Sequence, residues 1–281
     1  GSISSITVSA GDTTGTATFD PTDDSIYEGN ETAVISISSV SGADAAESGS
    51  QSVTITITEN DSSPTITLAT SATSIAENAG SSLTLTATSS IVADEDITVS
   101  ISTSGTGTEG TDYSTISDIT ISAGATTGTT SFTPTDDSTF EGDETGIVAI
   151  SGVSGADAAE DGTQSVTITI TNDDSAPTVT LTSSASSITE NAGSSLTLTA
   201  TLSNPTTADV TVGISTSGTG TEGTDYATIS DITISAGATT GTASFTPTDN
   251  SIFEGNETGI VAISTVSGGS ATEDGTQSVT I

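Results

Sequence analysis

The chain has 281 residues, with 37 Asp and Glu and no Lys, Arg or His, so its formal net charge is −37 at pH 7. With no cationic side chain it cannot neutralise phosphate, which excludes nucleic acid and anionic membrane surfaces as partners. It also has no Cys, and no apolar run approaches the ~20 residues of a membrane helix, which excludes disulfides, thiolate metal sites and membrane insertion.

The sequence repeats with a period of 113 residues. Glu28, Glu141 and Glu254 have this spacing, and glycines and glutamines follow it elsewhere. Repeats of this length are whole domains in series. Acidic segments that lead into a proline mark the junctions, so we place a partial repeat at 1–61, a complete one at 62–174 and a third at 175–281 that lacks its last strand end. We expect the sequence to be part of a longer array.

Within the complete repeat, seven short segments alternate between β-branched or apolar residues and polar residues, which indicates strands rather than a disordered chain. In chain order they are Ile66/Leu68, Leu83/Leu85/Ala87, Ile97/Val99/Ile101, Ile119/Ile121, 130–133, 147–150 and Val166/Ile168/Ile170. Seven strands without helical periodicity predict an all-β fold of tandem antiparallel two-sheet sandwiches, with a closed barrel as the weaker alternative. The recurring aromatic residues are expected to anchor the cores: Tyr113, Phe132, Phe140, Tyr226 and Phe245.

The acidic loop at 136–144 carries the strongest functional signal. It contains two aspartates followed by Glu141 and Glu144, and similar sets recur near Glu28 and Glu254. Acids repeated in register without any side-chain cation need a counter-charge from outside. Calcium takes 6 to 8 oxygen ligands, several of which such a loop can supply. The alternative is a set of solvated turns, which is our interpretation of the acidic run at 94–96, since its counterpart keeps only Asp209.

Five elements of the complete repeat resemble the Calx-β family of calcium-binding sandwich repeats in their order along the chain. These are the Glu-Asn entry at Glu77, the Gly-Thr-Asp-Tyr turn, the Ile-Ser-Ala-Gly strand, the acidic loop, and the closing Asn-Asp-Asp. The resemblance implies calcium ligands in all three repeats. In the complete repeat they are Glu77, Asp112, Asp136, Asp137, Glu141, Glu144, Asp173 and Asp174. In the third they are Glu190, Asp225, Asp249, Glu254 and Glu257, and in the first Asp23, Asp24, Glu28, Glu31 and Asp61. Asn250 replaces one aspartate of the third repeat.

Without His, Cys or Lys, nucleophilic triads and imidazole chemistry are impossible, so we expect no catalysis and no catalytic residues. Near-identical repeats indicate that the length of the array matters more than a distinct function of each domain. We therefore expect an extracellular or cell-surface array that calcium stiffens into a stalk or filament segment, with neighbouring repeats and possibly other copies as partners. Two alternatives remain open, an adhesin whose repeats bind a glycan or a cell surface, and a calcium-sensing module.

Overall fold

The computed structural model describes residues 3–281, and its chain forms two compact units. The first consists of residues 3–73, 81–133 and 146–168, and the second of residues 74–80, 134–145 and 169–281. Strands, turns and loops make up residues 3–281, so no segment of this range forms a helix that could cross a membrane. This confirms the all-β class.

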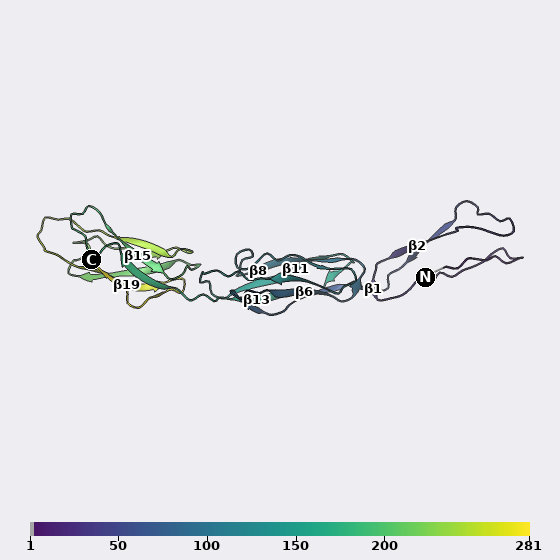
Figure 1. The fold of residues 1–281 in the computed structure, drawn as a ribbon, viewed down its shortest axis with the longest axis horizontal. Helices are drawn as coiled ribbons and strands as arrows, with labels where there is room; N and C mark the ends of the chain where they lie inside the picture. Colours follow the sequence, from purple (N-terminus) through teal and green to yellow (C-terminus); the bar gives the residue numbers. More distant parts are fainter. Residues whose placement is uncertain (1–2) are drawn as a thin grey trace. The chain divides into compact units, whose positions relative to one another are not determined.

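Two sheets organise the first unit (Figure 1). One has the order β10-β6-β4-β12, and the other contains β13-β11-β8-β9. The pairs β10·β6, β4·β6, β11·β8 and β8·β9 are antiparallel, while the short β12 joins β4 in parallel. The strands are β4 (Thr65–Thr70), β6 (Leu83–Ser89), β8 (Ile97–Gly105), β9 (Ile119–Ile121), β10 (Thr127–Phe132), β11 (Glu144–Ser154), β12 (Ala159–Glu160) and β13 (Ser165–Thr171).

Period-two alternation explains why these strands form. In β4, Ile66 and Leu68 are buried while the residues beside them are exposed, and β9 repeats the pattern with Ile119 and Ile121. Each predicted strand of the complete repeat is present, which confirms the antiparallel two-sheet architecture. In the core, Tyr113 stacks on Phe132, with ring centroids 4.7 Å apart.

The start of the first unit has fewer strands. They are β1 (Ile26–Tyr27) and the antiparallel pair β2 (Glu31–Ser36) and β3 (Ser52–Ile57). β1 pairs in parallel with β7 (Val92–Ala93), which belongs to the complete repeat. Alternation is visible in β2, but its Val34 is 66% exposed and Val53 of β3 is 55% exposed. These two strands therefore lack the second layer that covers the sheets of the complete repeat.

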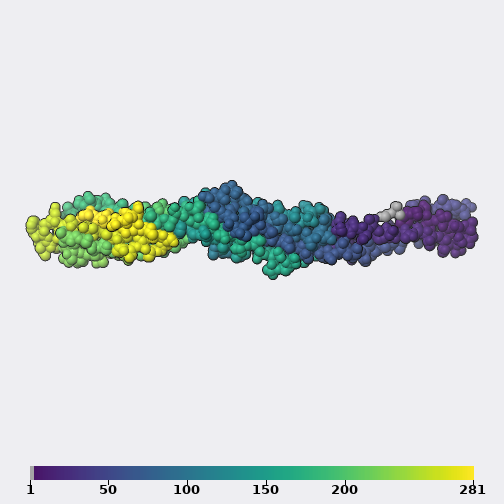
Figure 2. All heavy atoms as spheres, turned by 90° about the horizontal axis from the view of Figure 1, so that it is seen from below, coloured from purple at the N-terminus to yellow at the C-terminus, as the bar shows by residue number. Residues whose placement is uncertain are grey.

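The second unit repeats the sandwich (Figure 1). Its sheets have the orders β18-β15-β14-β20 and β17-β16-β19-β21, and β5 pairs in parallel with the end of β13. The strands are β5 (Ser74–Ala76), β14 (Thr178–Ser183), β15 (Leu196–Leu202), β16 (Val210–Gly218), β17 (Ile232–Ile234), β18 (Thr240–Phe245), β19 (Gly259–Ser267), β20 (Thr272–Glu273) and β21 (Ser278–Thr280). Figure 2 shows the last segment of the chain, in yellow, on the near face of this repeat.

The core of the third repeat lies between these two sheets. Leu198, Val212, Ile232 and Val261 are completely buried, and Tyr226 stacks on Phe245 with centroids 4.6 Å apart. The aromatic pair lines the same hollow as Glu254 and Glu257, which lie in the loop before β19.

One aromatic residue differs from our expectation. Phe140 is half-buried and is not a core anchor of its own repeat. Its backbone N–H donates to the carbonyl of Pro205 (2.9 Å), and it forms a parallel bridge with Thr206. Phe140 thus contacts the segment between β15 and β16 of the next repeat, and not the core of its own.

Candidate metal centre

The acidic loop has the same local structure in all three repeats. The side-chain oxygen Oδ1 of Asp24, Asp137 or Asn250 accepts the backbone N–H two residues later, at 2.9, 2.6 and 2.6 Å. This Asx turn is a local bond that Asp and Asn form equally well, so Asn250 keeps the turn and removes the charge. Five residues after the Asp or Asn that begins each turn stands a glycine with positive φ (70°, 80° and 79°): Gly29, Gly142 and Gly255. The chain thereby reverses before the next strand.

In the third repeat, three predicted ligands come together. Asp225, Glu254 and Glu257 each offer a carboxylate oxygen, and these oxygens all lie within 4.8 Å of one another. Ile188, Tyr226 and Phe245 are among the apolar residues that line the hollow around them. Loss of hydration raises the pKa of Glu257 above its usual value, and the charges of Asp225, Glu254 and Glu190 add to that effect.

The remaining predicted residues of this repeat surround that group. Glu190 accepts the backbone N–H of Asn250 (3.0 Å), and the amide of Asn250 donates to Glu254 (3.3 Å). Asp249 is exposed in the same loop. Asn250 therefore connects two of the predicted acids by hydrogen bonds, in a place where an aspartate would add another negative charge.

In the complete repeat, Glu77 is the most buried acid of the set. It is 6% exposed at the end of β5. Loss of hydration raises its pKa to about 7, and Asp137, Glu141, Asp173 and Asp174 contribute through like-charge repulsion. The second unit thus gathers predicted ligands from three separate segments of the chain around one buried carboxyl group.

The closing residues after β13 contain two polar atoms without partners among residues 3–281. Oδ1 of Asn172 and Oδ2 of Asp174 are buried and accept no hydrogen bond. Burial raises the pKa of Asp174, and the nearby charges of Asp173, Asp137 and Asp136 raise it further. Asp173 itself accepts a hydrogen bond from the amide of Asn78 (2.6 Å). Buried oxygens that lack donors are suited to a cation.

Asp112 and Glu144 complete the predicted set of this repeat. Asp112 belongs to the first unit, is 8% exposed and accepts the N–H of Thr108 (2.6 Å). Its counterpart Asp225 accepts the N–H of Thr221 in the same way (2.6 Å). Glu144 is the first residue of β11 and is half-buried.

In the first repeat, the predicted acids surround a residue that we did not predict. Glu59 accepts the N–H groups of Glu28 and Gly29 with one oxygen and those of Asn60 and Asp61 with the other, at 2.7–2.8 Å. These bonds lower its pKa, the bond from Asp61 most of all. In contrast, loss of hydration raises the pKa of Asp61, with further repulsion from Glu59, Asp23 and Asp24.

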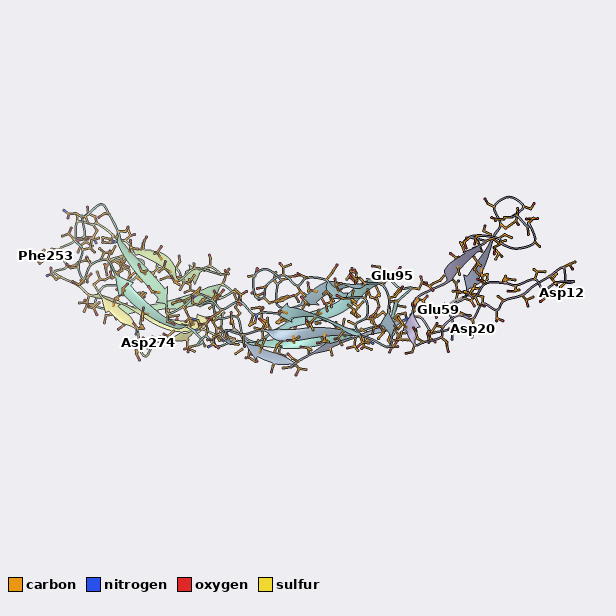
Figure 3. The ribbon with its side chains drawn as sticks, turned by 45° about the vertical axis from the view of Figure 1, so that its right-hand side comes forward. Asp12, Asp20, Glu59, Glu95, Phe253 and Asp274 are labelled. Carbon is orange, nitrogen blue, oxygen red and sulfur yellow. The ribbon has the colours of Figure 1, made fainter. Side chains whose placement is uncertain are left out.

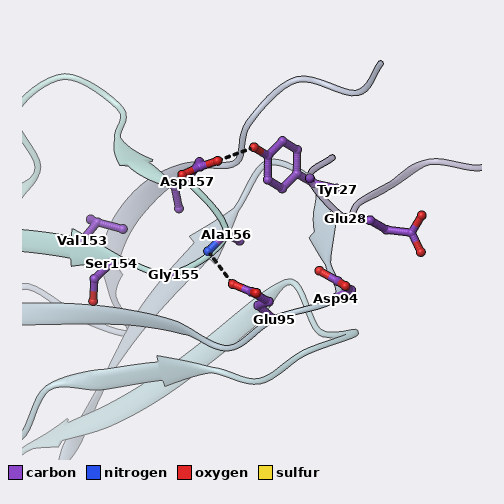
Figure 4. A pocket seen from close by; sticks show the side chains of 11 residues that line it. Tyr27, Glu28, Asp94, Glu95, Val153, Ser154, Gly155, Ala156 and Asp157 are labelled. Atoms are coloured by element: carbon purple, nitrogen blue, oxygen red, sulfur yellow. Dashed lines mark hydrogen bonds between the residues drawn. The ribbon is translucent and has the colours of Figure 1, made fainter. Parts of the chain in front are cut away.

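Glu28 faces acids of its own repeat and of the next one. Burial raises its pKa, followed by repulsion from Asp24, Glu31, Asp94 and Glu59. The run at 94–96 is exposed, as we expected of a solvated loop, but two of its acids accept backbone hydrogen bonds. Glu95 accepts the N–H of Ala156 (3.4 Å), and Asp96 accepts that of Ala123 (2.8 Å). Asp94 and Glu95 line the same pocket as Glu28, with Glu95 directed toward Ala156 (Figure 4).

Several recurring acids bind the backbone within their own repeat. Glu109 accepts hydrogen bonds from Thr103 and from the N–H of Ile116, at 2.7 Å each. Glu222 makes the equivalent bonds in the third repeat, and Asp118 and Asp231 each accept a strand N–H (2.9 Å). We did not predict a role for these residues, although the 113-residue period marks them as strongly as it marks the predicted ligands.

These groups fit calcium. All the clustered donors are oxygens, mostly carboxylates, which are the ligands that Ca²⁺ prefers, while a zinc site would use Cys or His. The unpartnered oxygen of Asp174 and the raised pKa of Glu77 both indicate negative charge that no protein group neutralises.

Glu77 predicts how stability depends on pH without metal. Its folded pKa of about 7 exceeds its ordinary value of 4.5, so between these values the folded state holds a proton that the unfolded state has lost. In chelator, the free energy of unfolding should therefore fall by ~1.4 kcal/mol per pH unit as pH rises from about 5 to 7. Urea unfolding followed by circular dichroism measures this slope. The variant E77Q should reduce it, and an equal slope in E77Q would contradict the assignment.

Comparison with known proteins gives the following matches. The model of the Calx-beta domain family matches residues 5–61, 59–174 and 172–281. Among solved structures, CBD12 from CALX1.2 is 18% identical over 69% of this chain and 77% of that chain, with a TM-score of 0.33. The adhesin InvE of Yersinia pseudotuberculosis is 12% identical over 78% of this chain and 60% of that one, with a TM-score of 0.35. None of the curated proteins matches the chain.

Proposed function

Because this chain belongs to the Calx-beta domain family, we propose that it is a calcium-binding array of tandem repeats that acts as a structural spacer. The observation that carries this proposal is the grouping of carboxylates in a chain with no Lys, Arg or His. Folding brings these like charges together, and only a cation from solution can neutralise them.

The residues that would hold the ion come from several segments. In the third repeat they are Asp225, Glu254 and Glu257. In the complete repeat, Glu77 follows β5, Asp137 and Glu141 lie in the loop before β11, and Asp173 and Asp174 follow β13. Bound calcium would supply positive charge and tie these segments to one another.

We place the array outside the cell. Millimolar extracellular calcium saturates even weak sites, so the ion acts there as a permanent part of the fold and not as a signal. The recurrence of nearly the same sequence in successive repeats supports length as the selected property. We also propose that the chain has no enzymatic activity, because carboxylates held as metal ligands are not free for acid–base work and the chain has no His, Cys or Lys to activate a nucleophile.

Small-angle scattering of the 281-residue chain tests the spacer function. Calcium at the segment that follows β13 would order the residues leading into the next repeat, whereas repelling acids would leave a short polar linker. We expect a longer maximum dimension and a narrower distance distribution in millimolar calcium than in chelator. Magnesium at the same concentration is the control for ionic strength.

Identical scattering profiles in calcium and chelator would contradict metal-dependent stiffening. Titration against a panel of glycans, with and without calcium, distinguishes the spacer from a chain whose repeats bind sugar directly. A spacer should give no saturable binding in either condition.

A further inference from the structure

Three aromatic residues occupy the same position in the three acidic loops. Tyr27, Phe140 and Phe253 are 113 residues apart, and each directly precedes a predicted calcium ligand. In the first two loops the aromatic residue contacts the repeat that follows it in the chain.

In the first unit, the loop adds a strand to the next repeat. β1 pairs with β7 in parallel, Ile26 with Val92 and Tyr27 with Ala93. The N–H of Asp94 donates to the carbonyl of Tyr27 (3.1 Å), and Tyr27 is only 7% exposed. The tyrosine hydroxyl donates to Oδ2 of Asp157 (2.8 Å), as Figure 4 shows.

The second unit contains the equivalent contact. Phe140 bridges to Thr206, the counterpart of Ala93, and its N–H donates to the carbonyl of Pro205 (2.9 Å). Thr206 is 1% exposed. A short parallel pairing therefore occurs twice in this chain, between an acidic loop and the segment that links the second and third long strands of the following repeat.

The aromatic residue and the residue at the position of Asp157 both change between these two contacts. Tyr27 has a hydroxyl and meets Asp157, whereas Phe140 has none, and Ser270 stands at the position equivalent to Asp157. Asp157 and Ser270 both have positive φ, 47° and 53°, so the turn that presents them is the same. An aspartate opposite phenylalanine would lose its hydrogen bond partner, so the acid suits only the tyrosine contact.

The third loop has no such partner among residues 3–281. Phe253 is 98% exposed and Ile252 is 66% exposed, and Figure 3 shows Phe253 pointing outward. The pairing segments of the chain, at 92–93 and 205–206, are already taken by the first and second loops. A second copy of the chain therefore offers Phe253 no vacant segment of this kind.

We propose that Ile252 and Phe253 form a docking strand for a further Calx-beta repeat that follows in the same chain. That repeat receives the strand in parallel at its counterpart of Thr206, and it carries a residue without negative charge at its counterpart of Ser270. This is strand addition to a sheet edge, in which backbone bonds give affinity and side chains give selectivity. The inference does not depend on calcium, so it goes beyond the proposed function.

An extended chain tests this inference. Because Ile281 and Ile168 are equivalent, residues 169–281 can be added again after Ile281 in the correct phase. The chain has no Trp, so the variant F253W gives a single fluorescent probe. We expect emission at shorter wavelength and weaker quenching by acrylamide in the extended chain than in the 281-residue chain, in chelator and in calcium. The variant F140W, whose site is already docked, is the positive control.

A second extension tests the selectivity. Adding residues 56–168 instead presents counterparts of Val92, Ala93 and Asp157, which suit tyrosine. With native Phe253, exchange of its amide hydrogen should be about tenfold slower in the first extension than in the second, equivalent to ~1.4 kcal/mol. F253Y should reverse this order. Equal quenching of F253W in the extended and original chains, with F140W protected, would overturn the docking; equal exchange in both extensions would overturn the side-chain selectivity.

Discussion

Removal of calcium by a chelator is expected to lower the unfolding temperature of this chain by roughly 10 °C. Calcium that binds only the folded state adds about 2.7 kcal/mol per independent site at a hundred times the dissociation constant, and 1 kcal/mol shifts a domain of about 100 residues by ~4 °C. The effect is large because the folded state holds groups such as Glu77, whose pKa of about 7 reflects burial among other acids.

Thermal unfolding followed by circular dichroism in chelator, in millimolar magnesium and in millimolar calcium measures this shift. Magnesium controls for general screening, because both cations shield the net charge of −37 while calcium tolerates more protein ligands and irregular geometry. Equal midpoints in magnesium and calcium would attribute the stability to screening and would contradict a specific site.

The fold was predictable from the sequence because β-strand alternation is local. Each of Ile66, Val99 and Ile168 is buried where period two requires it, and no distant contact is needed to infer that. The position of Phe140 was not predictable in the same way. In the sequence, an aromatic residue of a loop looks the same as one of the core. Only the pairing of Phe140 with Thr206 of the next repeat shows that it belongs to the loop.

The candidate site was predictable only in part. The 113-residue period identifies acids that recur, but it does not separate those that bind backbone N–H groups from those left without donors. Glu109 recurs and is satisfied by Thr103 and Ile116, whereas Asp174 has a buried oxygen without a partner. This difference depends on which segments meet in the folded chain, so it needs the structure.

The double variant E254Q/E257Q is expected to weaken calcium binding to the third repeat by about a hundredfold. Its two carboxylates and that of Asp225 offer oxygens within 4.8 Å of one another, so an ion there would contact all three residues. A hundredfold loss is ~2.7 kcal/mol, which is modest beside the ~4 kcal/mol between unit charges 4 Å apart near a protein surface. Isothermal titration calorimetry resolves the change as the loss of one class of sites.

The control variant D12N/D274N also removes two charges. Asp12 and Asp274 are exposed and lie outside the predicted clusters (Figure 3). If general acidity attracts the metal, the two double variants should lose affinity equally. If Glu254 and Glu257 form a site, only their replacement should weaken one class of binding events, and D12N/D274N should bind as the unmodified chain does.

The effect of E254Q/E257Q on the unfolding midpoint should have opposite signs in chelator and in calcium. In chelator, the pKa of Glu257 is raised by lost hydration and by repulsion from Asp225, Glu254 and Glu190, so glutamines relieve an unfavourable grouping and the midpoint should rise. In calcium the same glutamines remove ligands, and the midpoint should fall below that of the unmodified chain. A purely structural role for these residues would lower the midpoint in both conditions, and a purely solvated loop would leave it unchanged in both. A rise of the midpoint in chelator together with a fall in calcium is expected only if these carboxylates are ligands of a cation.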